Sequence, residues 1–158
     1  MVAAKGVKAL GLRSIPAHIE MIHGKQGVKL VEIGARVGGY RPRMYQKSYG
    51  INIAEFEIQN AIGQPLSKDK LSRHAQKFTT VYELFPSTVG EFRAVTGITE
   101  TQEARYDYYR VKAKPGQTVG PAKLGYKAAL VIIVTSDNHV EFTQQCQSVD
   151  ALSIEVTL

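Results

Sequence analysis

The sequence predicts an α+β fold in which a helix-and-hairpin part is followed by a small antiparallel β part. Before residue 66, apolar residues recur at helical spacing on either side of one candidate hairpin. After residue 78, the apolar segments are short and separated by turn residues, which is typical of strands. The polar stretch 67–73 lies between them, so we expect domains over residues 1–66 and 67–158.

The first part begins with a predicted helix and a predicted hairpin. Residues 2–10 have apolar side chains near helical spacing, and Gly11 is a plausible end to that helix. Residues 15–22 and 28–33 are apolar-rich strand candidates. The string HGKQG at 23–27 has turn chemistry, so these two strands are expected to pair.

Two further helices are expected after the hairpin. Residues 34–39 are rich in glycine, and a helix is predicted over 42–49 because proline suits a first helical turn. Residues 51–62 have the apolar spacing of an amphipathic helix. Gly63 and Pro65 then predict its end.

The second part reads as strands with one helix. The longest continuous apolar run, 128–134, predicts a buried strand, and residues 139–149 predict a short helix. The turn residues KPGQ occupy 114–117. The other expected strands are residues 78–85, 90–95, 106–111 and 152–156.

Composition restricts the class of protein. The chain has 158 residues, 44% of them hydrophobic and 22% charged, which argues against disorder and against a membrane protein. No secretory signal is expected at the N-terminus. The only cysteine, Cys146, excludes an internal disulfide, fits a cytoplasmic protein and is expected to be buried and inert. The net charge of +6 is compatible with anionic partners, either nucleotides or nucleic acid.

The register of the hairpin decides whether two acidic residues face each other. A two-residue loop at 25–26 would place Glu20 and Glu32 on opposite faces. A three-residue loop at 25–27 would pair them directly, and it needs a left-handed residue at its last position. Gly27 can supply that conformation, so we predict the three-residue loop and the facing pair.

Two facing carboxylates repel each other unless a cation lies between them or one is protonated. Mg²⁺ is commonly held by one or two carboxylates together with substrate phosphates. Glycines and arginines follow the second acid, and these suit phosphate and carboxylate anions. The alternative is a pair of glutamates on a solvated face with no metal, and periodicity alone leaves both interpretations open.

Several strings resemble the ATP-grasp carboxylate–amine ligases of the biotin-carboxylase, glycinamide-synthetase and amino-acid-ligase type. They are residues 15–20 (IPAHIE), 31–39 (VEIGARVGG), 50–53 (GINI), 61–66 (AIGQPL), 114–117 (KPGQ) and 131–156. The hairpin is the most specific part, because element order, spacing and both acids agree. The resemblance implies the C-terminal part of an ATP-grasp lobe followed by a small antiparallel β domain.

The same resemblance implies a chemistry and a set of residues. These enzymes use ATP to convert a carboxylate into an acyl phosphate, which an amine then attacks. Glu20 and Glu32 would bind Mg²⁺ or Mn²⁺, and Arg36 would lie near the transferred phosphoryl group. An asparagine often follows the second acid by two residues, but this chain has Gly34 there, as do amino-acid-ligase relatives with a GAR string.

Arg41 and Arg43 are candidates for binding a substrate carboxylate, with solvated surface charge as the alternative. The family's glycine-rich lid and its two ATP-binding lysines have no counterpart in the sequence. We therefore expect the chain to need an ATP-binding N-terminal lobe from elsewhere, and to be inactive alone. Self-association is also expected, through the apolar surface that such a lobe would cover.

Two rival functions remain. One is a non-catalytic interaction or oligomerisation module. The other is a basic nucleic-acid-binding domain, for which the only specific feature is a set of tyrosines flanked by arginines; strand packing is the preferred explanation of these aromatic residues. The set consists of Arg105, Tyr106, Tyr108, Tyr109 and Arg110. A zinc site at His18 and His23 is disfavoured because no further ligands have suitable spacing.

Overall fold

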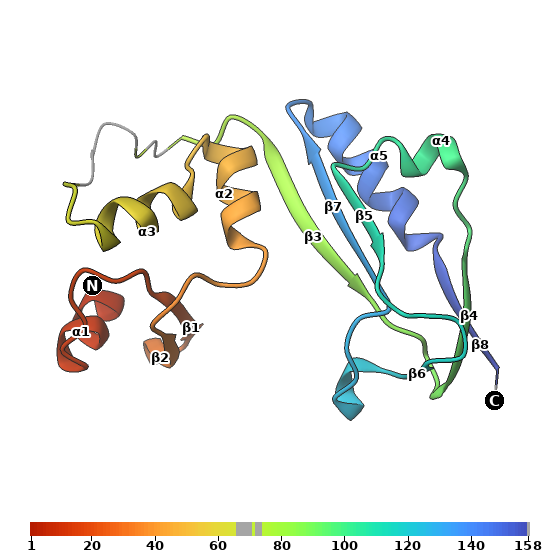
Figure 1. Ribbon diagram of the computed structural model, residues 1–158, viewed down its shortest axis with the longest axis horizontal. Helices are drawn as coiled ribbons and strands as arrows, with labels where there is room; N and C mark the ends of the chain where they lie inside the picture. The colour runs from red at the N-terminus through yellow and green to blue at the C-terminus, as the bar shows by residue number, and fades with distance from the viewer. Residues whose placement is uncertain (66–70, 72–73, 158) are drawn as a thin grey trace. The chain divides into compact units, whose positions relative to one another are not determined.

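The computed structural model describes residues 1–65, 71 and 74–157. It has the predicted α+β class and divides into two compact units, Met1–His74 and Ala75–Leu158 (Figure 1). The expected domain boundary between residues 66 and 67 lies outside the described residues, as does the expected linker apart from Leu71. Each unit is described by itself.

Over its described residues, the first unit contains one hairpin and three helices. The elements are α1 (Val2–Ala9), β1 (His18–Gly24), β2 (Gly27–Gly34), α2 (Arg41–Tyr49) and α3 (Ile53–Ala61). All of them were expected, but β1 begins three residues late and α3 two residues late. Asn52 explains the second difference: its side chain accepts a hydrogen bond from the Glu55 backbone N–H and so caps the helix.

The hairpin loop differs from the prediction. Gly24 pairs with Gly27, so the loop has two residues and the expected three-residue loop is wrong. Glu20 nevertheless faces Glu32, because the register shifts directly after Glu20 and leaves Val31 as an extra residue in β2. This bulge restores the pairing that a regular two-residue hairpin would have destroyed. Gly27 has a φ of 92°, the positive value expected of it.

The bulge also determines what helix α1 covers. A Cβ at Gly6 of α1 would lie 2.8 Å from Ile33 Cδ1 and 3.1 Å from Leu30 Cδ2. Residues three apart in a regular strand point to opposite faces. Leu30 and Ile33 can both contact the helix because Val31 takes up one residue between them. The acids are thereby left on the other face.

The second unit has two antiparallel three-stranded sheets, in the orders β3-β7-β5 and β6-β4-β8. Helix α5 lies along β7 and β3 (Figure 1). The elements are β3 (Phe78–Leu84), β4 (Gly90–Thr96), α4 (Glu100–Glu103), β5 (Tyr108–Val111), β6 (Thr118–Val119), η2 (Ala122–Leu124), β7 (Leu130–Ser136), α5 (His139–Asp150) and β8 (Ser153–Thr157).

Strand β7 is the centre of the core. Its apolar side chains from Leu130 to Val134 are 0% exposed, as the continuous apolar run predicted. Phe92 of β4 and Ile154 of β8 belong to the same cluster, so both sheets contribute to one core. Among the described residues, no helix is long and apolar enough to cross a membrane.

Three short elements were not expected: α4, β6 and η2. The strand expected over 106–111 begins only at Tyr108, because Tyr106 still closes the turn after α4 through a hydrogen bond from its N–H to the Glu103 carbonyl. Tyr106 is 8% exposed and stacks on Tyr109 with ring centroids 6.4 Å apart. The tyrosine set therefore does not form one exposed aromatic surface.

A hydrogen bond with Cys146, helped by burial, raises the pKa of Tyr82 to about 12. In the unfolded chain this phenol titrates near its usual value of about 10. Between these values the folded chain keeps a proton that the unfolded chain has lost, so stability falls as the pH rises from about 10 to 12. We expect urea midpoints to fall less steeply in Tyr82→Phe over this range; an unchanged slope would contradict the assignment.

Candidate metal and nucleotide site

The first unit presents two acids on an open face of its hairpin. Glu20 and Glu32 are directly opposed across β1 and β2, and both are exposed. Directly opposed side chains have Cβ atoms about 4.5–5.5 Å apart, so the two negative charges are close enough to repel. The arrangement favours any cation that can bind between them.

His18 lies on the same face of the hairpin, because it precedes Glu20 by two residues in β1. Its Nδ1 lies 3.8 Å from Glu20 Oε1, and its side chain is 20% exposed. The His18 ring packs closely against Gly38. A Cβ added at Gly38 would lie 2.5 Å from His18 Cδ2 and 2.8 Å from Cγ. Gly38 is thus needed for the ring to lie beside the Glu20 carboxylate.

Arg36 reaches this face from the loop that follows β2. A Cβ at Gly34 would point to the side that carries Glu32, because the two positions are two residues apart in the strand. That Cβ would lie 3.6 Å from Arg36 Cγ and 3.8 Å from Cζ. The arginine side chain therefore passes over Gly34, on the side of the acids. Its Nη1 donates to the Val37 carbonyl at 3.2 Å.

We call His18, Glu20, Glu32 and Arg36 the carboxylate face. Beside it lies a cavity of about 670 Å³, a size that suits a small ligand. Its polar and aromatic lining includes His18, Glu20, Arg41 and Tyr45. Arg41 Nη1 is 3.8 Å from Met44 Sδ. Arg43, the other predicted substrate residue, does not line this cavity.

The donors of the carboxylate face fit Mg²⁺ better than zinc. Within the described residues, no group of three or more His, Cys, Asp or Glu side chains is placed to hold a metal ion. A closed structural zinc site needs about four such ligands. Magnesium needs only one or two carboxylates when phosphate oxygens and water supply the rest, and Glu20 with Glu32 meet that requirement.

Comparison with solved structures identifies the fold. The chain aligns over 99% of its length with an L-amino acid ligase from Bacillus licheniformis, at a TM-score of 0.80 and 22% identity. It aligns over 98% with phosphoribosylglycinamide synthetase from Anaerococcus prevotii, at 0.69 and 16%. The fold is that of the C-terminal part of an ATP-grasp ligase.

A third ATP-grasp structure is the biotin carboxylase domain dimer of Hydrogenobacter thermophilus 2-oxoglutarate carboxylase, in complex with MgADP and bicarbonate. It has a TM-score of 0.63 and 14% identity over 98% of the chain. The chain spans 41%, 40% and 35% of the three structures, respectively. No protein-family model matches the sequence, and no curated protein matches it.

Two residues of this candidate site were not predicted as members. Gly38 was seen only as one of several glycines, and nothing in the sequence showed that it contacts His18. Tyr45 had a usable signal, because it follows Arg41 by four residues and such positions share a helix face. Arg43 is two residues from Arg41, which in a helix points away from it.

Replacing Gly38 by alanine is expected to displace the His18 ring, because the new Cβ would overlap it. Overpacking of this kind costs about 1–3 kcal/mol. Thermal unfolding followed by circular dichroism would measure the loss, and the His18 ring resonances should shift. Gly24→Ala is the control, since its Cβ meets nothing within 4 Å. Equal losses of stability in both variants would contradict the contact.

Proposed function

We propose that this chain supplies the metal-binding end of a ligase that uses ATP and Mg²⁺ to activate a carboxylate as an acyl phosphate, which an amine then attacks. The main support is the direct pairing of Glu20 with Glu32 beside an arginine and a ligand-sized cavity. The similar structures described above are a ligase, a synthetase and a biotin carboxylase domain, and the last of these is a complex with MgADP.

In this proposal Glu20 and Glu32 hold Mg²⁺ or Mn²⁺, which when bound would neutralise phosphate charge and orient the phosphate oxygens. Gly34 offers no side-chain oxygen, so the remaining ligands would be phosphate oxygens and water. Arg36 would contribute a fixed positive charge and hydrogen-bond donors toward the phosphoryl group. His18 would position Glu20, from which it is 3.8 Å away.

The proposed carboxylate substrate would occupy the cavity beside the acids. Arg41 is the better candidate for binding it, because it lines that cavity together with Glu20. A guanidinium group suits a carboxylate because two parallel N–H groups can donate to its two oxygens. Arg43 was proposed for the same role but has less support, since it does not line the cavity.

An ATP-binding lobe is the proposed partner. The hairpin exposes large apolar side chains, with Ile22 64% and Val31 57% exposed. Apolar surface of this kind marks an interaction site more often than a free surface. We propose that the lobe covers it and completes the nucleotide site, and that the reaction takes place in the cytoplasm.

Calorimetric titration with ADP in the presence of Mg²⁺ tests the proposal. We expect saturable binding that EDTA abolishes, and tighter binding when an ATP-binding lobe is added as a second polypeptide. Absence of Mg²⁺-dependent binding under both conditions would contradict the proposed function.

A second candidate function is self-association without catalysis. The same exposed apolar hairpin residues favour it. Light scattering of the chain over a range of concentrations distinguishes the two: a stable oligomer that does not bind ADP with Mg²⁺ would favour the interaction module. Dissociation of an oligomer when the lobe is added would favour the ligase.

A further inference from the structure

Helix α5 carries a polar stripe where it borders a cavity in the second unit. Glu141, Gln144, Gln145 and Ser148 lie at positions i, i+3, i+4 and i+7, which share one helix face. All four line a cavity of about 90 Å³. Glu141 and Gln144 are exposed, whereas Gln145 and Ser148 are half-buried, so only the last two are polar side chains partly withdrawn from solvent.

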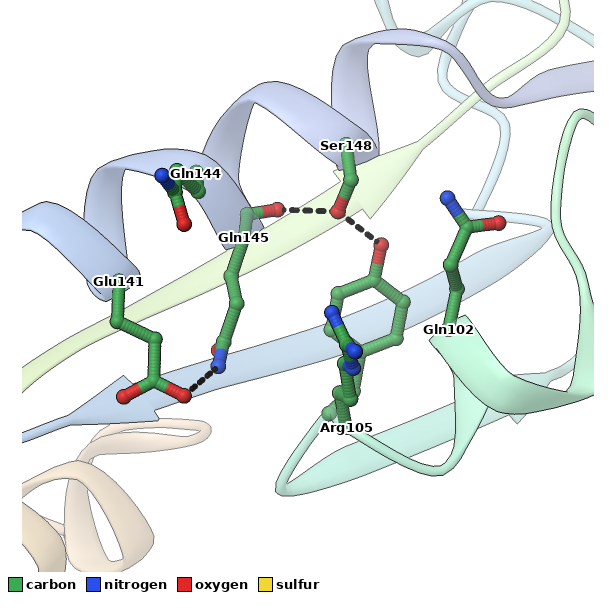
Figure 2. Close-up of a pocket in the computed structure, with 7 residues that line it drawn as sticks. Gln102, Arg105, Glu141, Gln144, Gln145 and Ser148 are labelled. Carbon is green, nitrogen blue, oxygen red and sulfur yellow. Dashed lines mark hydrogen bonds between the residues drawn. The ribbon is translucent and has the colours of Figure 1, made fainter.

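The opposite wall comes from α4 and the turn after it. Gln102, Arg105 and Tyr106 face the stripe, and Figure 2 shows Glu141 and Gln145 on one side of the cavity and Gln102 on the other. Gln102 is fixed by a capping box, in which its Oε1 accepts from the Thr99 backbone N–H at 3.0 Å. Its amide nitrogen remains available as a donor.

A short hydrogen-bond chain holds the two walls together. Ser148 Oγ donates to the Gln145 carbonyl oxygen at 2.7 Å, which uses its only proton. The Tyr106 hydroxyl, 2.8 Å from Ser148 Oγ, must therefore be the donor in that bond. The cavity wall is thus rigid at this end, with its protons assigned.

Two side-chain groups at the cavity, one a hydrogen-bond acceptor and the other a cation, have no partner among the described residues. Gln145 Oε1 is a buried acceptor with no hydrogen bond, one of two such atoms among the described residues. Its amide nitrogen is already used, donating to Glu141 Oε1 at 3.4 Å. The guanidinium group of Arg105, an exposed residue, makes no hydrogen bond or ion pair within the part of the chain that the structure describes. An unpartnered buried acceptor costs stability unless something fills the site.

We propose that this cavity binds a small zwitterion with the charge pattern of a free α-amino acid. The carboxylate would bind Arg105 and the Gln102 amide nitrogen, and the ammonium group would donate to Gln145 Oε1 beside the Glu141 carboxylate. A simple anion would leave the acceptor unused, and a simple cation would leave the guanidinium unused. The cavity of about 90 Å³ admits only a small molecule.

The site lies wholly within the second unit and shares no residue with the carboxylate face. The inference therefore does not depend on the proposed ligase function. An amino acid bound here would stabilise the second unit, because it binds only the folded state.

Two-dimensional ¹H–¹⁵N spectra of the whole chain, titrated with L-alanine, test the proposal. We expect saturable shifts of the backbone amides of residues 102–106 and 141–148, with a dissociation constant on the order of 1 mM. Acetate alone and methylamine alone carry the two halves of the zwitterion, and each should bind at least about tenfold more weakly. Equal binding of acetate and L-alanine, or no saturable shift, would overturn the proposal.

Variants separate recognition from folding. Arg105→Gln and Gln145→Leu should each weaken L-alanine binding by about tenfold or more, because each removes one half of the recognition. The matched controls are Arg110→Gln and Gln147→Leu, exposed residues that do not line the cavity. Gln145→Leu should change the melting temperature little, because losing the 3.4 Å hydrogen bond to Glu141 Oε1 is offset by removing an unpartnered buried acceptor. Unchanged affinity in both cavity variants would overturn the inference.

Discussion

Glu32→Gln is expected to weaken binding of ADP in the presence of Mg²⁺ by at least about 10–100-fold, because even residues that only orient a metal ligand matter that much. The stability of the chain should respond in the opposite sense when metal is absent. In EDTA the two acids repel each other, and removing one charge should stabilise the first unit by about 0.2–1 kcal/mol. Calorimetry and thermal unfolding with and without Mg²⁺ measure both effects.

Glu57→Gln is the matched control for this experiment. Glu57 is an exposed acid on α3 and the substitution removes the same charge. It should leave both the ADP affinity and the response to EDTA unchanged. If Glu32→Gln and Glu57→Gln behave alike, or if Glu32→Gln loses stability in EDTA, the paired acids are not a metal site.

The second large effect is expected at Gly97, which follows β4. Its φ is 83°, and a Cβ there would overlap the backbone carbonyl oxygen of Ala151, which no side-chain rotation can relieve. Gly97→Ala should therefore destabilise the second unit by about 2–4 kcal/mol, from the left-handed backbone and the clash together. Urea unfolding followed by circular dichroism measures the change.

Gly125→Ala separates the two causes. Gly125 has a φ of 82°, nearly the same as Gly97, but its Cβ would meet nothing within 4 Å. This variant should lose only about 1 kcal/mol, the cost of the backbone conformation alone. Similar losses in the two variants would show that Ala151 moves aside and that the contact is unimportant.

The elements that the sequence predicted well are those whose burial is visible in the chain itself. Strand β7 is a continuous apolar run because it is central in its sheet and buried throughout. Helix α4 was missed because four residues are too few to show a periodicity. Its only local signal was the capping pair Thr99 and Gln102.

The hairpin shows why the loop could not be predicted with the same reasoning. Loop length and strand register are linked only in a regular hairpin. Here the bulge at Val31 breaks that link, and it accompanies contacts of Leu30 and Ile33 with α1, a helix outside the hairpin. The prediction that Glu20 faces Glu32 was therefore correct, although the loop length from which it was derived was wrong.

The candidate site was predictable in its charged residues and not in its supports. Glu20, Glu32 and Arg36 were identified by spacing and resemblance. Gly38 is necessary only because the His18 ring lies against it, and that contact joins segments 20 residues apart. The zwitterion cavity had its α5 spacing in the sequence, but its opposite wall depends on the unpredicted α4.

The extra residue in β2 has a consequence for comparing this chain with distant relatives. If Val31 were missing, Glu32 would follow Leu30 directly and would still fall opposite Glu20, in a regular ladder. A protein one residue shorter at this position would thus keep the same two ligands on the same side. Alignments of such hairpins should allow a single-residue gap at position 31. Without that gap, the acid of one protein would be aligned with an apolar residue of the other.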